Sequence, residues 1–183
     1  MSLWKKIFGE KSGRETFDPL RDLTLPKLKV GFLVDYELKT WQVKQRDSYD
    51  FDGDRNYEWK LDAGDDVCFL AQESESSNKW TISRPIAFSG LGQDVRDHVR
   101  THEDPPPVID YKGTQFSLTE SGAGHYYQDD RDEGEELIYW DYVDATSKHI
   151  LTIQQWGEDE FEASSGLYVS EYEFSNVLPG PAD

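Results

Sequence analysis

The stretch VDYELKTWQV (residues 34–43) returns as IDYKGTQFSL (residues 109–118), at a constant offset of 75 residues. Each copy places a two-residue turn between a short apolar segment and a longer alternating one. YEWKL (57–61) then matches IYWDY (138–142) at an offset of 81 residues. A repeat of this length sets the whole architecture, so we interpret it first. It predicts two similar units in tandem.

The residues within each unit alternate between apolar and polar. Tyr57, Trp59 and Leu61 are separated by Glu58 and Lys60, the period of a strand with one face on a core and the other face in water. Aromatic residues make up 14% of the chain, which suits pleated sheets better than helices. Turn-forming dipeptides such as Asp52-Gly53 lie between the expected strands.

We therefore expect a mainly β fold, built from two similar small antiparallel β-barrel or sandwich units in tandem and packed together. A short linker helix and an N-terminal arm complete it. The helix is indicated by Leu91, Val95 and Val99, spaced four apart ahead of a triple proline. Whether the units share one sheet stays open. The expected parts are a basic arm (1–22), a first β unit (23–88), a linker with the helix and a Pro-rich connector (89–107), a second β unit (108–178) and a tail (179–183).

The charge of the chain limits its partners and its location. A formal charge of −18 repels phosphate backbones, so nucleic acid is not an expected partner. Cys68 is the single cysteine, which fits a reducing compartment. We see neither a secretory signal nor a run of about 20 apolar residues. We expect a bacterial cytoplasmic protein with at most peripheral contact with the inner membrane.

SYDFDGDRNYEW (48–59) has the aspartates of a calcium loop around Gly53. Such a loop needs a glutamate at its twelfth position, and here Trp59 stands there. The flanking segments also read as strands instead of helices. An acidic hairpin turn that keeps a sheet edge soluble is the competing interpretation.

His98 and His102 are a second, weak metal candidate, because a spacing of four puts both on one face of the expected helix. On a polar linker helix, such residues usually form a solvated face. The chain shows none of the nucleophile-elbow, phosphate-loop or dinucleotide motifs. We therefore expect a binding protein rather than an enzyme, with no cofactor and no dedicated metal.

The N-terminal arm has the composition of an interfacial anchor. Trp4, Ile7 and Phe8 would share one side of a helix, with Lys5 and Lys6 beside them. Three apolar side chains and two lysines give weak membrane or partner binding at best. Packing of the same residues back onto the β units is the alternative.

The segment YWDYVDATSKHILTIQQWGEDEFEASSGLYV (139–169), together with LKVGFLVDYELKTWQV (28–43), resembles the uncharacterised bacterial domain-of-unknown-function (DUF) family 4178. Members of that family lie near genes for phage-shock (PspA-like) envelope-stress proteins and for polyamine synthesis. The family has no established activity and supplies no catalytic residues. The resemblance implies an accessory role at the inner membrane surface.

Two functions remain open. In the first, acidic loops bind a basic, PspA-like or membrane-associated partner protein, without enzymatic activity. In the second, the same carboxylates and nearby aromatic rings hold a polyamine or a divalent cation. Acidity that only confers solubility is the third explanation. The residues expected to contact partner or ligand are Asp50, Asp52, Asp54, Asp129, Asp130, Asp132, Glu133, Glu135, Glu136, Trp140, Tyr142 and Trp156.

Overall fold

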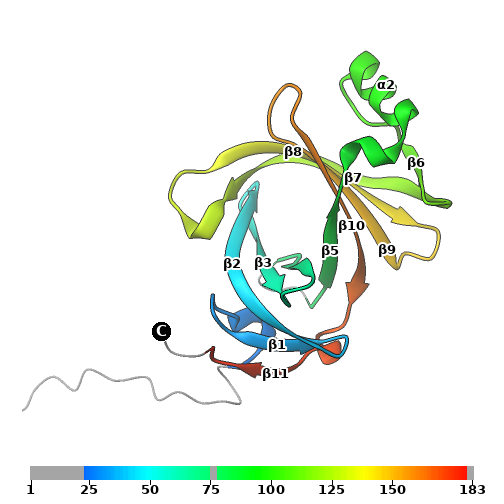
Figure 1. Cartoon of the computed structure of the whole chain (residues 1–183). Helices are drawn as coiled ribbons and strands as arrows, with labels where there is room; N and C mark the ends of the chain where they lie inside the picture. Colours follow the sequence, from blue (N-terminus) through cyan, green and yellow to red (C-terminus); the bar gives the residue numbers. More distant parts are fainter. Residues whose placement is uncertain (1–22, 75–77, 181–183) are drawn as a thin grey trace, which may run out of the picture.

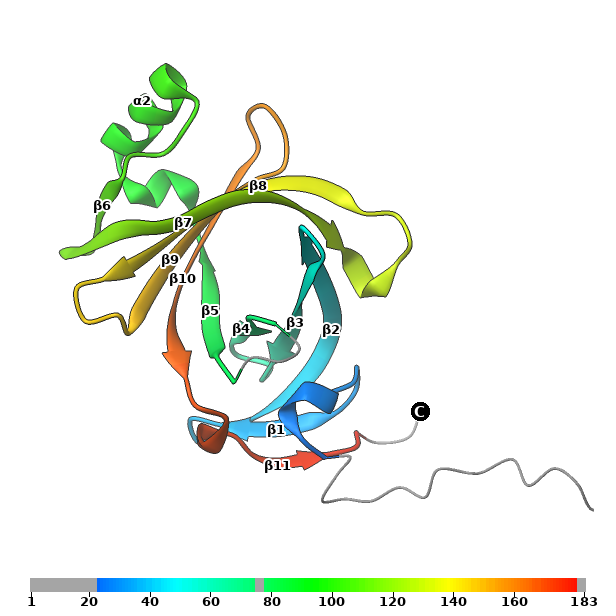
Figure 2. The same ribbon diagram turned by 180° about the vertical axis from the view of Figure 1, so that it is seen from behind.

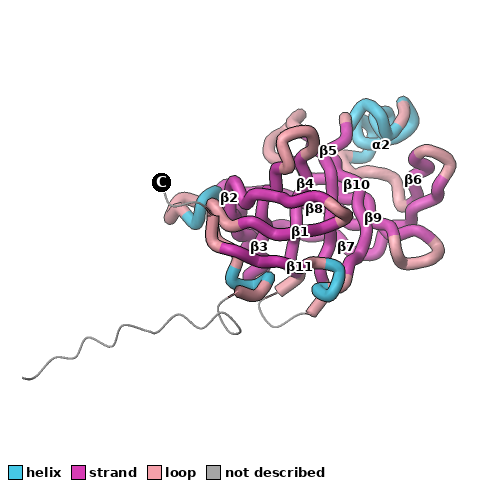
Figure 3. The backbone as a smooth tube through the Cα atoms, turned by 60° about the horizontal axis from the view of Figure 1, so that its bottom comes forward, coloured by secondary structure: helices cyan, strands magenta, loops and turns pink. Residues whose placement is uncertain are grey.

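A computed structural model describes residues 23–74 and 78–180 of the protein. The expected mainly β fold is confirmed, and strands dominate every view (Figure 3). The strands are β1 (Leu33–Tyr36), β2 (Lys39–Phe51), β3 (Asp54–Asp62), β4 (Val67–Gln72), β5 (Trp80–Ile86), β6 (Val108–Tyr111), β7 (Thr114–Tyr127), β8 (Glu135–Asp144), β9 (His149–Gln155), β10 (Phe161–Val169) and β11 (Ser175–Leu178). The helical elements are η1 (Leu25–Lys27), η2 (Phe88–Leu91), α2 (Gln93–His102), η3 (Gln128–Asp130) and η4 (Glu171–Glu173).

All of these strands belong to one antiparallel sheet in the order β11-β1-β2-β3-β4-β5-β10-β9-β8-β7-β6. A further pairing joins β2 to β7 and closes the strands from β2 round to β7 into a ring (Figures 1 and 2). The first parts of β2 and β7 run on past this junction. There β2 pairs with β1, and β7 pairs with β6. The two units therefore share one sheet.

The two halves of the ring repeat one another strand by strand. β1–β5 and β6–β10 have the same order, and β2–β7 and β5–β10 are the two junctions between them. Each half has a register shift at the same place, between Val43 and Gln45 and between Leu118 and Glu120, again 75 residues apart. This correspondence is compatible with a duplicated unit.

The outer face of the ring carries two separate apolar cores. The first contains Trp41, Trp59 and Leu61 and is covered by η1, β1 and the chain around Phe174. The second contains Trp140, Tyr142 and Ile153 and is covered by η2, α2 and β6. Helix α2 lies outside the ring in both views (Figures 1 and 2). The expected linker helix is thus present, and Leu91 and Val95 pack on the second core.

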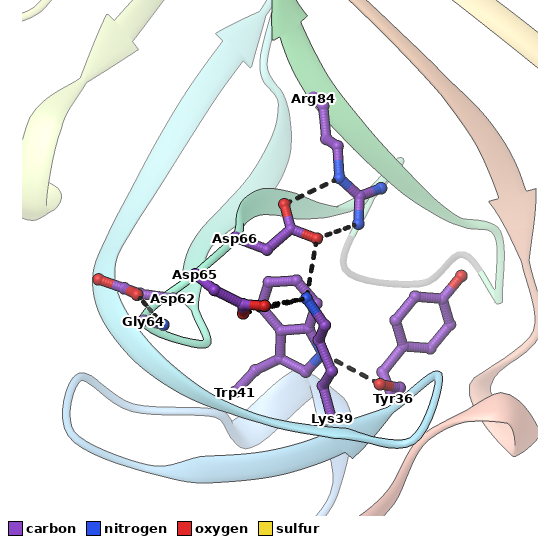
Figure 4. A network of polar contacts seen from close by, with 8 residues as sticks. All are labelled: Tyr36, Lys39, Trp41, Asp62, Gly64, Asp65, Asp66 and Arg84. Atoms are coloured by element: carbon purple, nitrogen blue, oxygen red, sulfur yellow. Dashed lines mark hydrogen bonds and ion pairs between the residues drawn. The ribbon is translucent and has the colours of Figure 1, made fainter.

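Polar contacts close the first core at its rim (Figure 4). The Trp41 indole N–H donates to the Tyr36 carbonyl at 3.0 Å, so the buried indole has a partner. Lys39 pairs with Asp65 at 3.0 Å, and Arg84 pairs with Asp66 at 3.0 Å. Asp62 accepts from the Gly64 N–H at 2.6 Å and fixes the β3–β4 turn. These contacts hold the loop over the indole of Trp41.

Candidate functional site

The acidic segment that resembles a calcium loop forms the β2–β3 hairpin turn. Asp52 and Gly53 both have positive φ (55° and 95°), the geometry of a tight hairpin turn. The Asp50 carboxylate accepts from the Gly53 N–H at 2.8 Å. Asp54 is exposed at the start of β3. Asp50 thus fixes the turn, and its flanks are strands, as the hairpin interpretation expects.

The hairpin lies beside β7, with which β2 pairs, and it borders a groove of about 530 Å³ that β7 and β8 also line. Four of the expected binding residues line that groove: Asp50, Asp52, Glu136 and Trp156. Ile138, 42% exposed, contributes an apolar side chain to the same groove. Acidic groups and an indole that are far apart in the sequence therefore meet at one place.

The close approach of the hairpin depends on a glycine. A Cβ on Gly124 would lie 2.4 Å from Cδ1 of Phe51 and 2.7 Å from the Asp50 carbonyl oxygen. Such distances exclude any side chain there without movement of β2. His125 follows, and its Nε2 lies 4.0 Å from Oε1 of Glu136. Gly124 thereby brings the carboxylates of the turn to the groove.

The other expected binding residues lie elsewhere. Asp132, Glu133 and Glu135 are exposed near the β7–β8 loop and do not line the groove. Asp129 donates its backbone N–H to Asp47 at 3.0 Å, and Asp130 ends the same 3-10 turn. The loop therefore adds negative charge to one end of the molecule without joining the groove.

Trp140 and Tyr142 belong to the second core, with exposed fractions of 4% and 0%. The Tyr142 hydroxyl donates to the Pro106 carbonyl at 3.0 Å and ties β8 to the proline-rich connector. Neither ring can stack on a ligand unless the core opens. Their role in the structure is packing.

The two histidines of the weak metal candidate lie on α2, outside the groove. His98 and His102 sit side by side on α2, with ring centroids 4.3 Å apart. His98 Nδ1 is 2.8 Å from the Asp104 carbonyl oxygen. Within residues 23–74 and 78–180, no group of three or more His, Cys, Asp or Glu could hold a metal ion. The anchor residues Trp4, Lys5, Lys6, Ile7 and Phe8 lie outside the described residues.

A polar cluster on the inner face of the ring was missed by the sequence analysis. The Tyr49 hydroxyl on β2 donates to Glu58 Oε1 on β3 at 3.3 Å. Burial raises the pKa of Tyr49, and the nearby side chain of Gln154, on β9, lowers it in part. Around the ring, β7 and β8 lie between β2 and β9, so these side chains approach each other on its inner side. Asp141, on β8, accepts from the Thr152 hydroxyl at 2.6 Å.

The inner carboxyl groups hold their protons more tightly than usual. Burial, together with the nearby charges of Asp47 and Glu162, raises the pKa of Glu58 to about 7. Burial likewise raises the pKa of Asp141 to about 6. Strand parity could have indicated this cluster, because Glu58 and Asp141 alternate with the buried Trp59 and Trp140. The prediction that this face meets bulk water is therefore wrong for Glu58 and Asp141.

Helices in the described ranges, 23–74 and 78–180, are too short or too polar to span a bilayer. An "Uncharacterized protein" of Aquifex aeolicus (strain VF5) is 25% identical to the chain over 175 residues, covering 96% of each. No solved structure matches the chain. Residues 29–171 match the family described as "Domain of unknown function (DUF4178)". This match spans most of the chain and confirms the resemblance: the protein belongs to the DUF4178 family.

Proposed function

We propose that the protein is a non-enzymatic interaction module whose groove between the β2–β3 hairpin and β7–β8 binds a basic segment of a partner protein. The convergence of Asp50, Asp52 and Glu136 on one groove with Trp156 supports this most directly. A Lys or Arg side chain of the partner would pair with the carboxylates. Its aliphatic stem, or a neighbouring apolar residue, would cover Ile138.

The charge of the whole chain supports the same proposal. A net charge of −18 attracts a basic partner over distances comparable to the Debye length and raises the association rate. Individual exposed ion pairs contribute only about 0.2–1 kcal/mol each. The affinity must therefore come from several pairs together with the apolar contact, and it should fall as salt rises.

The setting that the family resemblance implies suggests a partner. We propose a PspA-like protein, met in the cytoplasm at the inner surface of the membrane. The arm around Trp4 and Phe8 would add a second, weak contact with that assembly, which raises the effective concentration of the groove. Removing residues 1–12 should then weaken capture of the partner while leaving binding of an isolated basic peptide unchanged.

The groove can be tested with two double variants of equal charge. Asp52→Asn with Glu136→Gln removes two groove charges, and Asn suits the positive φ at position 52. Asp132→Asn with Glu133→Gln removes two exposed charges outside the groove. Interferometry against a purified PspA-like protein should show binding about three- to tenfold weaker for the first pair and nearly unchanged for the second. An equal loss of affinity for both pairs would mean that binding depends on the overall negative charge and not on the groove.

The inner face supports a second candidate, binding of a small polyamine inside the ring. An eight-stranded ring can hold one small ligand. The inward residues Ala71, Thr81, Ser83 and Ser164 are small and half-buried. Glu58, Asp141 and Glu162 supply carboxylates, and Tyr49 and Tyr126 supply aromatic rings. A polycation there would replace the proton that Glu58 retains at its raised pKa.

Spermidine titration by calorimetry tests this candidate. We expect saturable binding that Glu58→Gln with Asp141→Asn abolishes and that the exposed control pair, Asp132→Asn with Glu133→Gln, preserves. Magnesium at equal ionic strength is the reference. A magnesium response as large as that of spermidine would mean that the carboxylates attract any cation and do not recognise a polyamine.

A further inference from the structure

A second groove, of about 460 Å³, lies where the outer faces of β5, β9 and β10 meet the β6–β7 hairpin. Its chemistry is opposite to that of the acidic groove. Arg84 and Lys112 line it together with His149, and none of its lining residues described in the structure is acidic. In a chain of charge −18, a groove lined only by basic and neutral side chains is unusual.

A buried carboxylate that does not line the groove, Asp144, holds His149 in place. Its Nδ1 lies 2.9 Å from Oδ2 of Asp144, a carboxylate that is only 6% exposed. The His149 contact, together with donors from Thr146 and two backbone N–H groups, holds the pKa of Asp144 well below its usual range. An ionised Asp144 places the ring proton on Nδ1. Nε2 is then the nitrogen that remains for a ligand, and it donates to an anion when the ring carries its second proton.

Arg84 is oriented in a similar way. Its Nε and Nη2 donate to the two oxygens of Asp66 at 3.2 and 3.0 Å, a bidentate pair (Figure 4). A guanidinium has five N–H donors, so this pair leaves others for the groove. Both bases are thus fixed by carboxylates that do not line the groove themselves.

Lys112 completes the set from the opposite wall. It lies in the β6–β7 turn with φ of 53°, and its Nζ is 5.1 Å from the centroid of the Tyr111 ring. The remaining lining is mixed. Ile86 and Pro85 supply apolar surface above the buried Phe116, while Thr114 and Ser165 supply hydroxyl groups.

We propose that this groove binds a small organic anion, with an apolar or aromatic body against Pro85 and Ile86 and a carboxylate or phosphate group between Arg84, Lys112 and His149. The volume falls in the range of small-molecule sites. Because Arg84 and His149 are already held in place, binding a ligand would cost little side-chain entropy. The site shares no residue with the acidic groove, so it stands independently of the function proposed above.

Two aromatic probes distinguish the anionic group. Phenyl phosphate and benzoate are titrated into the full chain, with amide and His149 imidazole resonances followed by NMR. Saturable shifts at His149, Lys112 and Thr114 are expected for at least one probe, and the tighter probe identifies phosphate or carboxylate. Benzyl alcohol, which lacks the charge, should produce no saturable shift.

Lys112→Asn removes one groove charge while keeping a residue that tolerates positive φ. Lys44→Gln removes one exposed charge from β2, outside the groove, as the matched control. The dissociation constant should rise about tenfold or more in Lys112→Asn and stay within twofold in Lys44→Gln. No saturation at millimolar probe, or equal affinity in both variants, would overturn the proposal.

Discussion

The two faces of the ring differ in a way that reverses the usual barrel. Along β3, Trp59 and Leu61 face outward and are fully buried under flanking elements, whereas Glu58 and Lys60 face inward and are half-buried. A small barrel normally fills its interior with apolar side chains. Here the apolar cores are satellites outside the ring, and the interior combines carboxyl groups such as Glu58 with aromatic rings such as Tyr49 and Phe51. The buried carboxyl groups and the two apolar cores therefore lie on opposite faces of the same strands.

The halves of the ring also differ in how they cover their outer cores. The first half uses two more strands, β1 and β11, whereas the second uses β6 and α2. The strand pairs beneath are alike: Trp59 lies opposite Leu70, and Trp140 lies opposite Ile153. The two halves of a duplicated sheet can therefore be covered by different elements. Each covering element only needs to supply apolar side chains over the core of its half.

The sharpest test of this division is truncation of an outer indole. Trp59→Ala should lower the free energy of unfolding by about 3–5 kcal/mol, measured by urea denaturation. It empties a fully buried site and leaves the Leu28 carbonyl without the indole N–H that donates to it at 3.0 Å. Trp140→Ala, in the second core, should cost a similar amount. If either cost stayed below 1 kcal/mol, that outer cluster would not be a core.

Much of this fold follows from the period of the sequence. Alternation through Tyr57, Trp59 and Leu61 fixes strands, and the repeat at Val34 and Ile109 indicates matching hairpins. Closure of the ring could not be predicted, because the β2–β7 junction involves a few backbone pairings such as Ser48 with Tyr127. Backbone pairing leaves little trace in side-chain pattern.

The candidate sites were predictable only in part. Asp50 and Glu136 are conspicuous as acids, but their meeting depends on Gly124, whose missing side chain lets the hairpin cross β7. Trp140 was expected at a binding surface and is buried instead, since its strand carries the second core. Alternation shows that Glu58 and Trp59 lie on opposite faces, but it does not show which face the ring encloses.

The inner face can be probed through pH. Native Glu58, with a pKa near 7, retains a proton that the unfolded chain releases above its ordinary value of 4.5. This contribution to stability is therefore present at acidic pH and is lost as pH rises through 7. Glu58→Gln copies the protonated form. It should match the wild type near pH 5 and exceed its free energy of unfolding by about 1–3 kcal/mol at pH 8.

Urea denaturation at a series of pH values gives this difference directly. Glu133→Gln, which removes an exposed carboxylate from the β7–β8 loop, is the control and should show no such dependence. A difference between Glu58→Gln and wild type that stays constant from pH 5 to pH 8 would mean that Glu58 titrates as if in water. The interior of the ring would then be filled by water that hydrates Glu58 as bulk solvent does.

The smallest expected effect isolates a single contact within the ring. Tyr49→Phe removes the hydroxyl that donates to Glu58 at 3.3 Å, and this donor lowers the pKa of Glu58 against the larger effect of burial. Without it the carboxylate is less stabilised, so the titration of Glu58 should move upward by a fraction of a pH unit. The carboxyl resonance of Glu58 in NMR reports the shift. A downward shift would show that water entering the vacated space solvates the carboxylate better than the phenol does, and the interior would then be wetter than the half-buried side chains indicate.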